Sequence, residues 1–211
     1  MQIAETIGCS VVGSELQPDL VECARDIAKR CKLDTVSFIA GDFLDFPEDE
    51  GGFDALTSVL CVLHFPLAQR PAMWAKAASL LKDGARVYLE DFFLRIDADG
   101  QRCAFSATEV ELLSKEIAID KGELPTRAEY VLALEAVGFC DIEFEDVSAD
   151  WSAFVTERYG LWVSGKERTV GVHGEGTWAS LEVFYRSMRT LFTSGKLGGV
   201  KLTATLKKTA P

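Results

Sequence analysis

The first half of the chain alternates between short apolar segments and amphipathic ones, and this alternation constrains the fold most strongly. The apolar segments at 10–16, 36–40, 53–63 and 86–93 are rich in β-branched and aromatic residues, as buried strands are. Segment 71–82 between the last two has an apolar helical face. A similar face lies between the first two, at Leu20, Val21, Ala24, Ile27, Ala28 and Cys31. Strands joined by single helices are typical of a parallel sheet covered on both faces.

The second half is predicted to be more helical. Capping-box spacing at Ser106–Glu109 and at Thr126–Glu129 predicts two helix starts, the second helix ending before Gly138. Two further amphipathic helices are expected, one after Asp150 and one over 177–193.

Alternating segments at 140–147 and 200–206 predict an edge strand and a terminal strand with one wet face. The glycine-rich stretch 171–176, which contains His173, is expected to be a mobile loop. With no repeat or obvious linker, one domain over 1–211 is the simplest organisation. The expected fold class is α/β: an open, mostly parallel, Rossmann-like sheet with helices on both faces and an antiparallel C-terminal strand.

Composition limits the partners. With 22 Lys and Arg against 33 Asp and Glu, the net charge is −11, which disfavours nucleic acid and anionic membranes and leaves small molecules or proteins. No segment has the roughly 18 apolar residues of a membrane span, and Met1–Thr6 lacks a signal-peptide pattern. Six scattered cysteines indicate a reduced, cytoplasmic compartment, and the two histidines lack cysteines at zinc-ligand spacing.

Candidate chemistry lies where the predicted strands end, since ligands of open parallel sheets bind past the carboxyl ends of the strands. Glu15, Asp42, the segment 59–64 and the pair Glu90 and Asp91 fall there. A carboxylate accepts from both hydroxyls of a ribose, and an acid on the next strand accepts from an adenine amine. The alternative is that Glu15 and Asp42 are ordinary helix-start or turn acids.

The order of these motifs resembles the class I S-adenosylmethionine-dependent methyltransferases. The string Val11-Val12-Gly13-Ser14-Glu15-Leu16-Gln17-Pro18 is similar to the family's second strand and helix, and Gly41-Asp42-Phe43 to its third-strand motif. Phe53-Asp54 through Leu63-His64 resembles the fourth strand, and Leu80-Leu81-Lys82-Asp83-Gly84 the turn into the fifth. Tyr130 to Phe139 resembles the late helix that ends in Gly-Phe. The pattern over 184–206 is most like small-molecule N-methyltransferases of the sarcosine/dimethylglycine or phosphoethanolamine type.

The resemblance implies S-adenosylmethionine as cofactor. Glu15 would hold the ribose hydroxyls, with Leu16 and Gln17 beside the adenosine. Asp42 would meet the adenine amine, with Phe43 flanking the ring.

The resemblance also implies where the acceptor binds. Leu60, within 59–64, would face the methionine end, and His64 would assist the acceptor's proton unless it is a histidine satisfied at a strand end. Phe92 and Phe93 would form an amine pocket, or plain core, and Arg158 would grip a substrate carboxylate or phosphate, as Arg186 and Arg189 also could. Four further aromatics are expected to pack the late helices: Trp151, Trp162, Trp178 and Tyr185.

Two departures from the family pattern concern activity. The family's first strand and glycine-rich loop have no counterpart before Glu15, so the domain is expected to be truncated relative to the family, with two apolar sheet edges. These edges pair with each other, are covered by a second copy or a partner, or reflect a longer product. Relatives often carry a polar residue where this chain has Val59 and Leu60.

Two hypotheses follow. In the first, the chain is an enzyme that methylates a small molecule, on an amine nitrogen. In the second, it is a non-catalytic, methyltransferase-like protein or fragment that acts through self-association or a partner.

Overall fold

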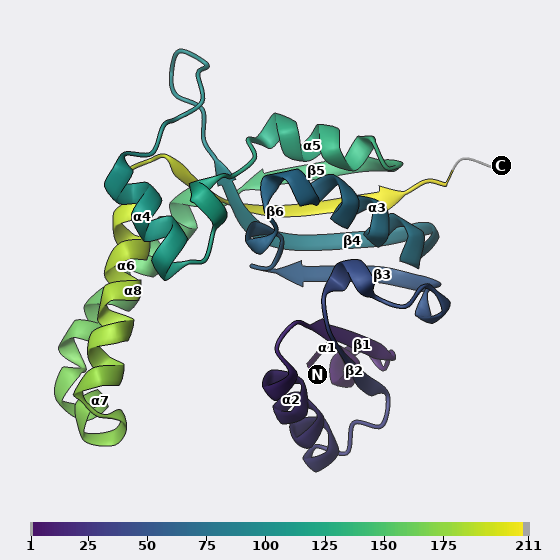
Figure 1. The fold of residues 1–211 in the computed structure, drawn as a ribbon, viewed down its shortest axis with the longest axis horizontal. Helices are drawn as coiled ribbons and strands as arrows, with labels where there is room; N and C mark the ends of the chain where they lie inside the picture. Colours follow the sequence, from purple (N-terminus) through teal and green to yellow (C-terminus); the bar gives the residue numbers. More distant parts are fainter. Residues whose placement is uncertain (1, 209–211) are drawn as a thin grey trace. The chain divides into compact units, whose positions relative to one another are not determined.

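The computed structural model describes residues 2–208, and the chain divides into two compact units, Met1–Gly52 and Phe53–Pro211. Each unit has its own sheet (Figure 1).

The first unit is built on two parallel strands. It runs in the order α1 (Gln2–Ile7), β1 (Val11–Glu15), α2 (Pro18–Arg30), β2 (Val36–Ala40) and two 3₁₀ turns, η1 (Phe43–Asp45) and η2 (Glu48–Glu50). β1 and β2 pair in register from Val11 opposite Val36 to Glu15 opposite Ala40. α2 begins at Pro18, whose fixed φ suits a first helical turn, and it buries Val21 and Ala28.

The second unit contains a four-stranded sheet in the order β3-β4-β6-β5. These strands are β3 (Phe53–Val59), β4 (Leu81–Leu94), β5 (Phe139–Asp146) and β6 (Leu197–Leu206). β3 runs parallel to β4, while β6 is antiparallel to both of its neighbours, β4 and β5. The predicted antiparallel terminal strand and the predicted edge strand are both confirmed.

Helices cover both faces of this sheet. The helical segments of this unit are η3 (Val62–His64), η4 (Leu67–Gln69), α3 (Arg70–Leu80), α4 (Ala107–Glu116), η5 (Asp120–Gly122), α5 (Arg127–Glu135), α6 (Ser148–Ser164), α7 (Lys166–His173) and α8 (Glu175–Thr193). On one face Phe93 packs edge-on against Phe144, which lies beside Tyr130 of α5. On the other face Phe92, the preceding residue of β4, packs against Trp151 of α6 and Phe192 of α8. The predicted α/β class, with helices on both faces, is confirmed.

Helices α6, α7 and α8 extend away from one end of the sheet (Figure 1). The indole N–H of Trp162 donates to the backbone oxygen of Trp178 at 3.2 Å, and Trp162 also packs against Tyr185. The predicted packing role of these aromatics is confirmed.

Both predicted capping boxes are present. Ser106 accepts from the backbone N–H of Glu109, whose carboxylate accepts from the N–H of Ser106 at 2.7 Å, and Thr126 and Glu129 repeat this arrangement at α5. Each capping box provides hydrogen-bond acceptors for backbone N–H groups at the helix start, which have no partner within the helix.

Two predicted ends were wrong. The strand predicted over 53–63 ends at Val59, because Leu60 has a φ of +51° and turns the chain out of the extended conformation. The helix predicted over 71–82 ends at Leu80, and β4 starts at once at Leu81. A shift in register between Phe53 and Ala55 accommodates the extra residues of β4 near Gly84.

The glycine-rich stretch 171–176 is not the predicted loop. α7 continues through Gly171 to His173, and only Gly174, with a φ of +86°, reverses the chain into α8. Lys166 stabilises this reversal, because it pairs with Glu175 at 2.9 Å and lies 4.0 Å above the ring of Trp178.

Each sheet has edge strands that pair on one side only. Within residues 2–208, β1 pairs with β2 alone, and β3 pairs with β4 alone. The expectation of one domain over 1–211 remains a prediction. None of the described helices is both long and apolar enough to cross a membrane.

Candidate functional site

The first candidate site lies where β1 and β2 end together. Glu15 is the last residue of β1 and pairs with Ala40, the last residue of β2. The N–H of Gly41 donates to the backbone oxygen of Glu15 at 3.0 Å, and Asp42 follows immediately. Parallel strands in this register bring Glu15 and Asp42 to the same edge of the sheet, as the sequence predicts.

Each of these carboxylates uses one oxygen to hold its own turn. Glu15 Oε1 accepts from the N–H of Gln17 at 2.9 Å, and Asp42 Oδ1 accepts from the N–H of Leu44 at 2.9 Å. Both acids therefore accept from the backbone N–H two residues further on, as acids in turns commonly do. Among the described residues, neither Glu15 Oε2 nor Asp42 Oδ2 has a hydrogen-bond partner, so each can accept from a hydroxyl or amine of a ligand.

The other predicted cofactor residues of this unit surround these acids along the chain. Leu16 is 68% exposed and Gln17 is exposed, so both side chains are accessible to a ligand. Phe43 is half-buried, with its ring 6.2 Å from that of Phe46.

In the second unit, His64 lies at the end of η3 with its side chain exposed. Its Nδ1 is 3.3 Å from the backbone oxygen of Ala118, the geometry of a hydrogen bond that Nδ1–H donates. With the proton on Nδ1, Nε2 keeps its lone pair and can accept a proton.

Leu60 lies at the turn between β3 and η3. Its amide donates to the backbone oxygen of Glu90 at 2.8 Å, and its side chain is 41% exposed. A positive φ of +51° is costly for leucine, and such strain gathers at functional sites. On β4, Tyr88 donates to the carboxylate of Glu90, and this hydrogen bond raises the pKa of Tyr88 to about 12.

Three predicted substrate residues lie apart from any described cavity. Phe92 and Phe93 are 3% and 5% exposed and belong to the packed interior. Arg158 lies on α6 with its guanidinium 5.9 Å above the ring of Phe154, which is itself exposed. Of the other arginines considered, Arg186 pairs with Glu182 and Arg189 lies over Tyr159.

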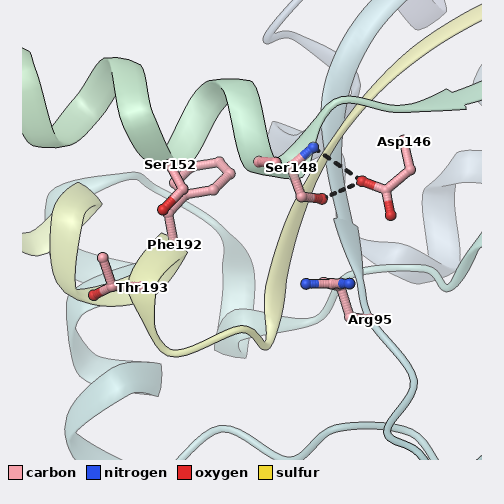
Figure 2. A pocket seen from close by; sticks show the side chains of 7 residues that line it. Arg95, Asp146, Ser148, Ser152, Phe192 and Thr193 are labelled. Atoms are coloured by element: carbon pink, nitrogen blue, oxygen red, sulfur yellow. Dashed lines mark hydrogen bonds between the residues drawn. The ribbon is translucent and has the colours of Figure 1, made fainter.

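The second unit contains an open pocket of about 530 Å³ at the start of α6 (Figure 2). It is lined by Arg95, Asp146, Ser148, Ala149, Ser152, Phe192 and Thr193. Asp146 Oδ1 accepts from the N–H of Ser148 at 2.9 Å and from its hydroxyl. Within the described part of the chain, the half-buried guanidinium of Arg95 has no hydrogen bond or ion pair, so this cation is free to meet an anion.

Arg95 was not predicted to be a site residue, although it lies only two residues past the strand predicted over 86–93. Strand ends of parallel sheets are where ligands bind, and this rule would have singled it out. The pocket's other residues come from α6, α8 and the end of β5, and only the tertiary fold brings them to Arg95.

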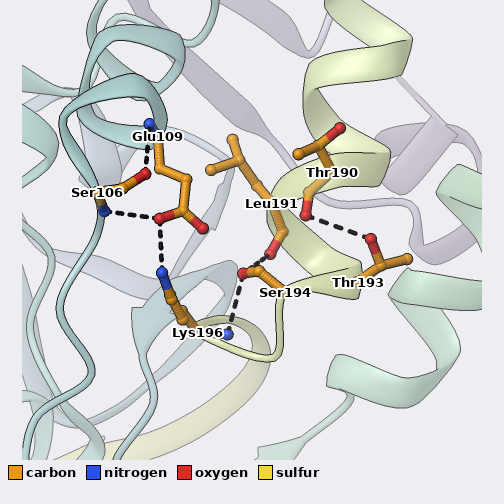
Figure 3. Close-up of polar contacts among 7 residues, drawn as sticks. All are labelled: Ser106, Glu109, Thr190, Leu191, Thr193, Ser194 and Lys196. Carbon is orange, nitrogen blue, oxygen red and sulfur yellow. Dashed lines mark hydrogen bonds and ion pairs between the residues drawn. The ribbon is translucent and has the colours of Figure 1, made fainter.

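The backbone of Arg95 is held by the turn that joins α8 to β6. The N–H of Arg95 donates to the backbone oxygen of Lys196 at 2.9 Å. Lys196 Nζ in turn lies 2.6 Å from Glu109 Oε2, which ties this turn to the capping box of α4 (Figure 3). Ser194 completes the turn by donating to the backbone oxygen of Leu191 at 2.7 Å. The turn beside the pocket is therefore fixed from several sides.

Comparison with protein families finds a match over residues 1–84, to the family described as a methyltransferase domain. A norajmaline N-methyltransferase of Rauvolfia serpentina is 37% identical over 65 residues, which are 30% of this chain and 22% of that protein. A sterol 24-C-methyltransferase of Debaryomyces hansenii is 26% identical over 152 residues, 71% of this chain and 38% of that protein.

Among solved structures, phosphoethanolamine N-methyltransferase 2 of Haemonchus contortus has a similar fold. Its complex with phosphomonomethylethanolamine and S-adenosylhomocysteine superposes with a TM-score of 0.84 at 17% identity, over 99% of this chain and 46% of that one. The chain spans less than half the length of each of these three relatives. It has the Rossmann-like fold of S-adenosylmethionine-dependent methyltransferases, with the match to their domain family in its first 84 residues.

Proposed function

We propose that the chain carries out S-adenosylmethionine-dependent methyl transfer to a small molecule, at an amine nitrogen. The observation that carries this proposal is the pair of carboxylates at the ends of two neighbouring parallel strands, Glu15 and Asp42, each with one oxygen free for a ligand. The domain match over residues 1–84 includes both acids.

The chemistry of these residues fits the adenosine of S-adenosylmethionine. The free oxygen of Glu15 would accept from a ribose hydroxyl, and that of Asp42 from the exocyclic amine of adenine. Leu16, Gln17 and Phe43 would lie against the adenosine, since they flank the two acids on exposed or half-buried turns. Leu60 would face the methionine end.

S-adenosylmethionine, when bound, would supply a methyl group on a sulfonium. The acceptor nitrogen would form its bond to that methyl carbon in line with the carbon–sulfur bond, which breaks as S-adenosylhomocysteine leaves. The chain's residues would hold the acceptor in line and take up its proton. His64 would accept that proton at Nε2, because Nδ1 is engaged with the backbone oxygen of Ala118. The aromatic cluster that contains Phe92 would form the apolar side of the acceptor site, with Phe93 supporting it from the opposite face of the sheet.

The acidic group of the acceptor would bind in the pocket beside Arg95. An amine is suggested by two of the similar proteins, which are named as N-methyltransferases. Arg95, unpaired within the described residues, is better placed than Arg158 to grip a carboxylate or phosphate on the acceptor, because Arg158 lies outside the pocket on an exposed stretch of α6.

The test is methyl transfer from S-adenosylmethionine carrying an isotopically labelled methyl group to a panel of small amines, with and without an acidic group. We expect labelled methylamine products, and we expect His64→Gln to lower kcat while the affinity for the cofactor is unchanged. Labelled product on oxygen or carbon would overturn the choice of nitrogen. No labelled product from any acceptor, despite cofactor binding, would overturn the proposed activity.

A further inference from the structure

A buried polar cluster lies beneath the turn that carries His64. Asp91 of β4 is fully buried, Arg70 at the start of α3 is 4% exposed, and Tyr130 of α5 is 1% exposed. Charged side chains are almost never buried to this extent unless they have partners. All three residues belong to the second unit. The sequence places Asp91 at a predicted strand end without a specific role, and it gives Arg70 no role at all.

Asp91 and Arg70 both form hydrogen bonds to the backbone of the turn that carries His64. Asp91 Oδ2 accepts from the N–H of Leu63 at 3.1 Å. Arg70 Nη2 donates to the backbone oxygen of Leu63 at 3.3 Å, and Arg70 Nε donates to that of Phe65 at 3.0 Å. The backbone on both sides of His64 is thereby fixed.

Arg70 also fixes the segment that holds the His64 ring. Its Nη2 donates to the backbone oxygen of Glu123 at 3.2 Å. Glu123 follows η5 in the same segment as Ala118, whose backbone oxygen bonds His64 Nδ1. One guanidinium therefore joins the backbone beside His64 to the segment that orients its imidazole.

The cluster contains more polarity than packing alone requires. Among residues 2–208, Arg70 Nη1 and Tyr130 Oη are buried without a hydrogen-bond partner. Buried unpaired polar atoms destabilise a fold, and apolar residues of similar volume are often at least as stable as buried charges. Packing therefore does not account for these charges, whereas their bonds to the turn do.

We propose that Asp91 and Arg70 are positioning residues, which hold the turn Val62–Phe65 so that His64 presents Nε2 to the acceptor. This inference rests on the proposed function, since it concerns the residue assigned there to accept the proton. Neither residue needs to touch cofactor or acceptor, because both act through Leu63 and Phe65.

The strength of the hydrogen bond between Asp91 and the Leu63 amide depends on the charge of Asp91. Burial raises the pKa of Asp91 to about 7, against the opposing effects of the amides of Phe92 and Leu63 and of the charge on Arg70. The groups that face it are Arg70 from α3, Tyr130 from α5 and the turn's own amides. As Asp91 takes up a proton, its bond to the Leu63 amide loses the strength of a charged acceptor.

The test uses amide and imidazole NMR signals of the whole chain. In the unmodified chain we expect the amide signals of Leu63 and Phe92 to titrate with one common midpoint near pH 7. In Asp91→Asn at a fixed pH, we expect exchange of the Leu63 amide to be about tenfold faster or more, with shifted His64 ring signals. The Leu202 amide in β6 should be unchanged. Because the chain has two histidines, His173→Gln assigns the ring signals.

The matched control is Glu90→Gln, which neutralises the preceding carboxylate of β4 and leaves the Leu63 contact intact. The proposal would be overturned if Asp91→Asn gave the same Leu63 exchange rate and His64 ring signals as Glu90→Gln. It would also be overturned if amide exchange in Asp91→Asn became faster by the same factor at Leu63 and at Leu202. If Asp91→Asn does not fold, the titration decides, and separate midpoints for Leu63 and Phe92 would overturn it. Failure of the proposed function would appear instead as absent methyl transfer, which these signals do not depend on. Where transfer occurs, Asp91→Asn should lower kcat and leave cofactor affinity unchanged.

Discussion

The ring of Phe38 on β2 lies directly against Gly13 on β1. The two residues are paired across the strands, and a Cβ added at Gly13 would stand 2.7 Å from the nearest ring carbon of Phe38. This contact leaves no room for a side chain at position 13, two residues before Glu15. The candidate cofactor acids therefore depend on a close contact between the strands that carry them.

Substitution of Gly13 by valine should consequently destabilise the first unit. We expect the free energy of unfolding to fall by about 1–3 kcal/mol, because the added methyl groups displace the ring of Phe38 or the strand itself. Chemical denaturation measures the change, and Ser14→Ala at the exposed neighbouring position is the control. Equal stability of Gly13→Val and the unmodified chain would show that Phe38 can move aside freely.

The capping box of α4 gives a second prediction. Removing its hydroxyl with Ser106→Ala should lower the free energy of unfolding by about 1 kcal/mol, because the amide of Glu109 loses its acceptor. The control is Thr108→Ala, an exposed position in the same first turn. Thermal or chemical unfolding distinguishes the two, and equal losses in both variants would contradict a capping role for Ser106.

The buried carboxyl of Asp91 predicts how stability depends on pH. Burial raises its pKa to about 7, so the folded chain keeps a proton that the unfolded chain releases near pH 4. The resulting stabilisation is complete below about pH 4 and is lost as the pH rises through 7.

Asp91→Asn lacks this titration. The unfolding free energy of the variant minus that of the unmodified chain should therefore increase between pH 5 and 8, as measured by denaturation across that range. A difference that stays constant would mean that Asp91 does not titrate there.

The pocket beside Arg95 predicts the specificity for acceptors. Arg95→Gln should raise the KM for acceptors with a carboxylate or phosphate about tenfold or more, because a charged hydrogen bond is lost, and should leave acceptors without an acid unaffected. Arg158→Gln is the matched control, since its guanidinium lies over Phe154 outside the pocket. A KM that rises in Arg158→Gln and not in Arg95→Gln would reverse the assignment.

Local sequence signals predicted most of the fold. The capping boxes, the strand 36–40 and the alternating terminal strand were recognised because each depends on contacts within a few residues or on the alternation of one strand. The errors arose where tertiary contacts decide. α7 remains helical through Gly171, and Lys166 at its start contacts Glu175 and Trp178 of α8, residues that a local pattern does not connect to it.

Of the candidate site residues, those placed by a local pattern could be predicted from the sequence, and those placed by tertiary contacts could not. Glu15 and Asp42 could be placed at strand ends, since the pattern of strand followed by turn is local. The contacts of Arg70 and Asp91 could not be predicted, because they join residues far apart in the sequence. Arg70 and its acceptor Glu123 are 53 residues apart, and Asp91 and its donor Leu63 are 28 residues apart. The sequence pointed to Arg158 and left Arg95 unconsidered, because a pocket lined by β5, α6, α8 and the residue after β4 has no local pattern.

The central claim is that Glu15 and Asp42 together bind one adenosine, and calorimetric titration with S-adenosylmethionine tests it most directly. The unmodified chain should bind, Glu15→Gln and Asp42→Asn should each weaken binding about tenfold or more, and Asp34→Asn, an exposed acid just before β2, should bind normally. Binding by both site variants at unchanged affinity, or no binding heat from the unmodified chain, would contradict the account.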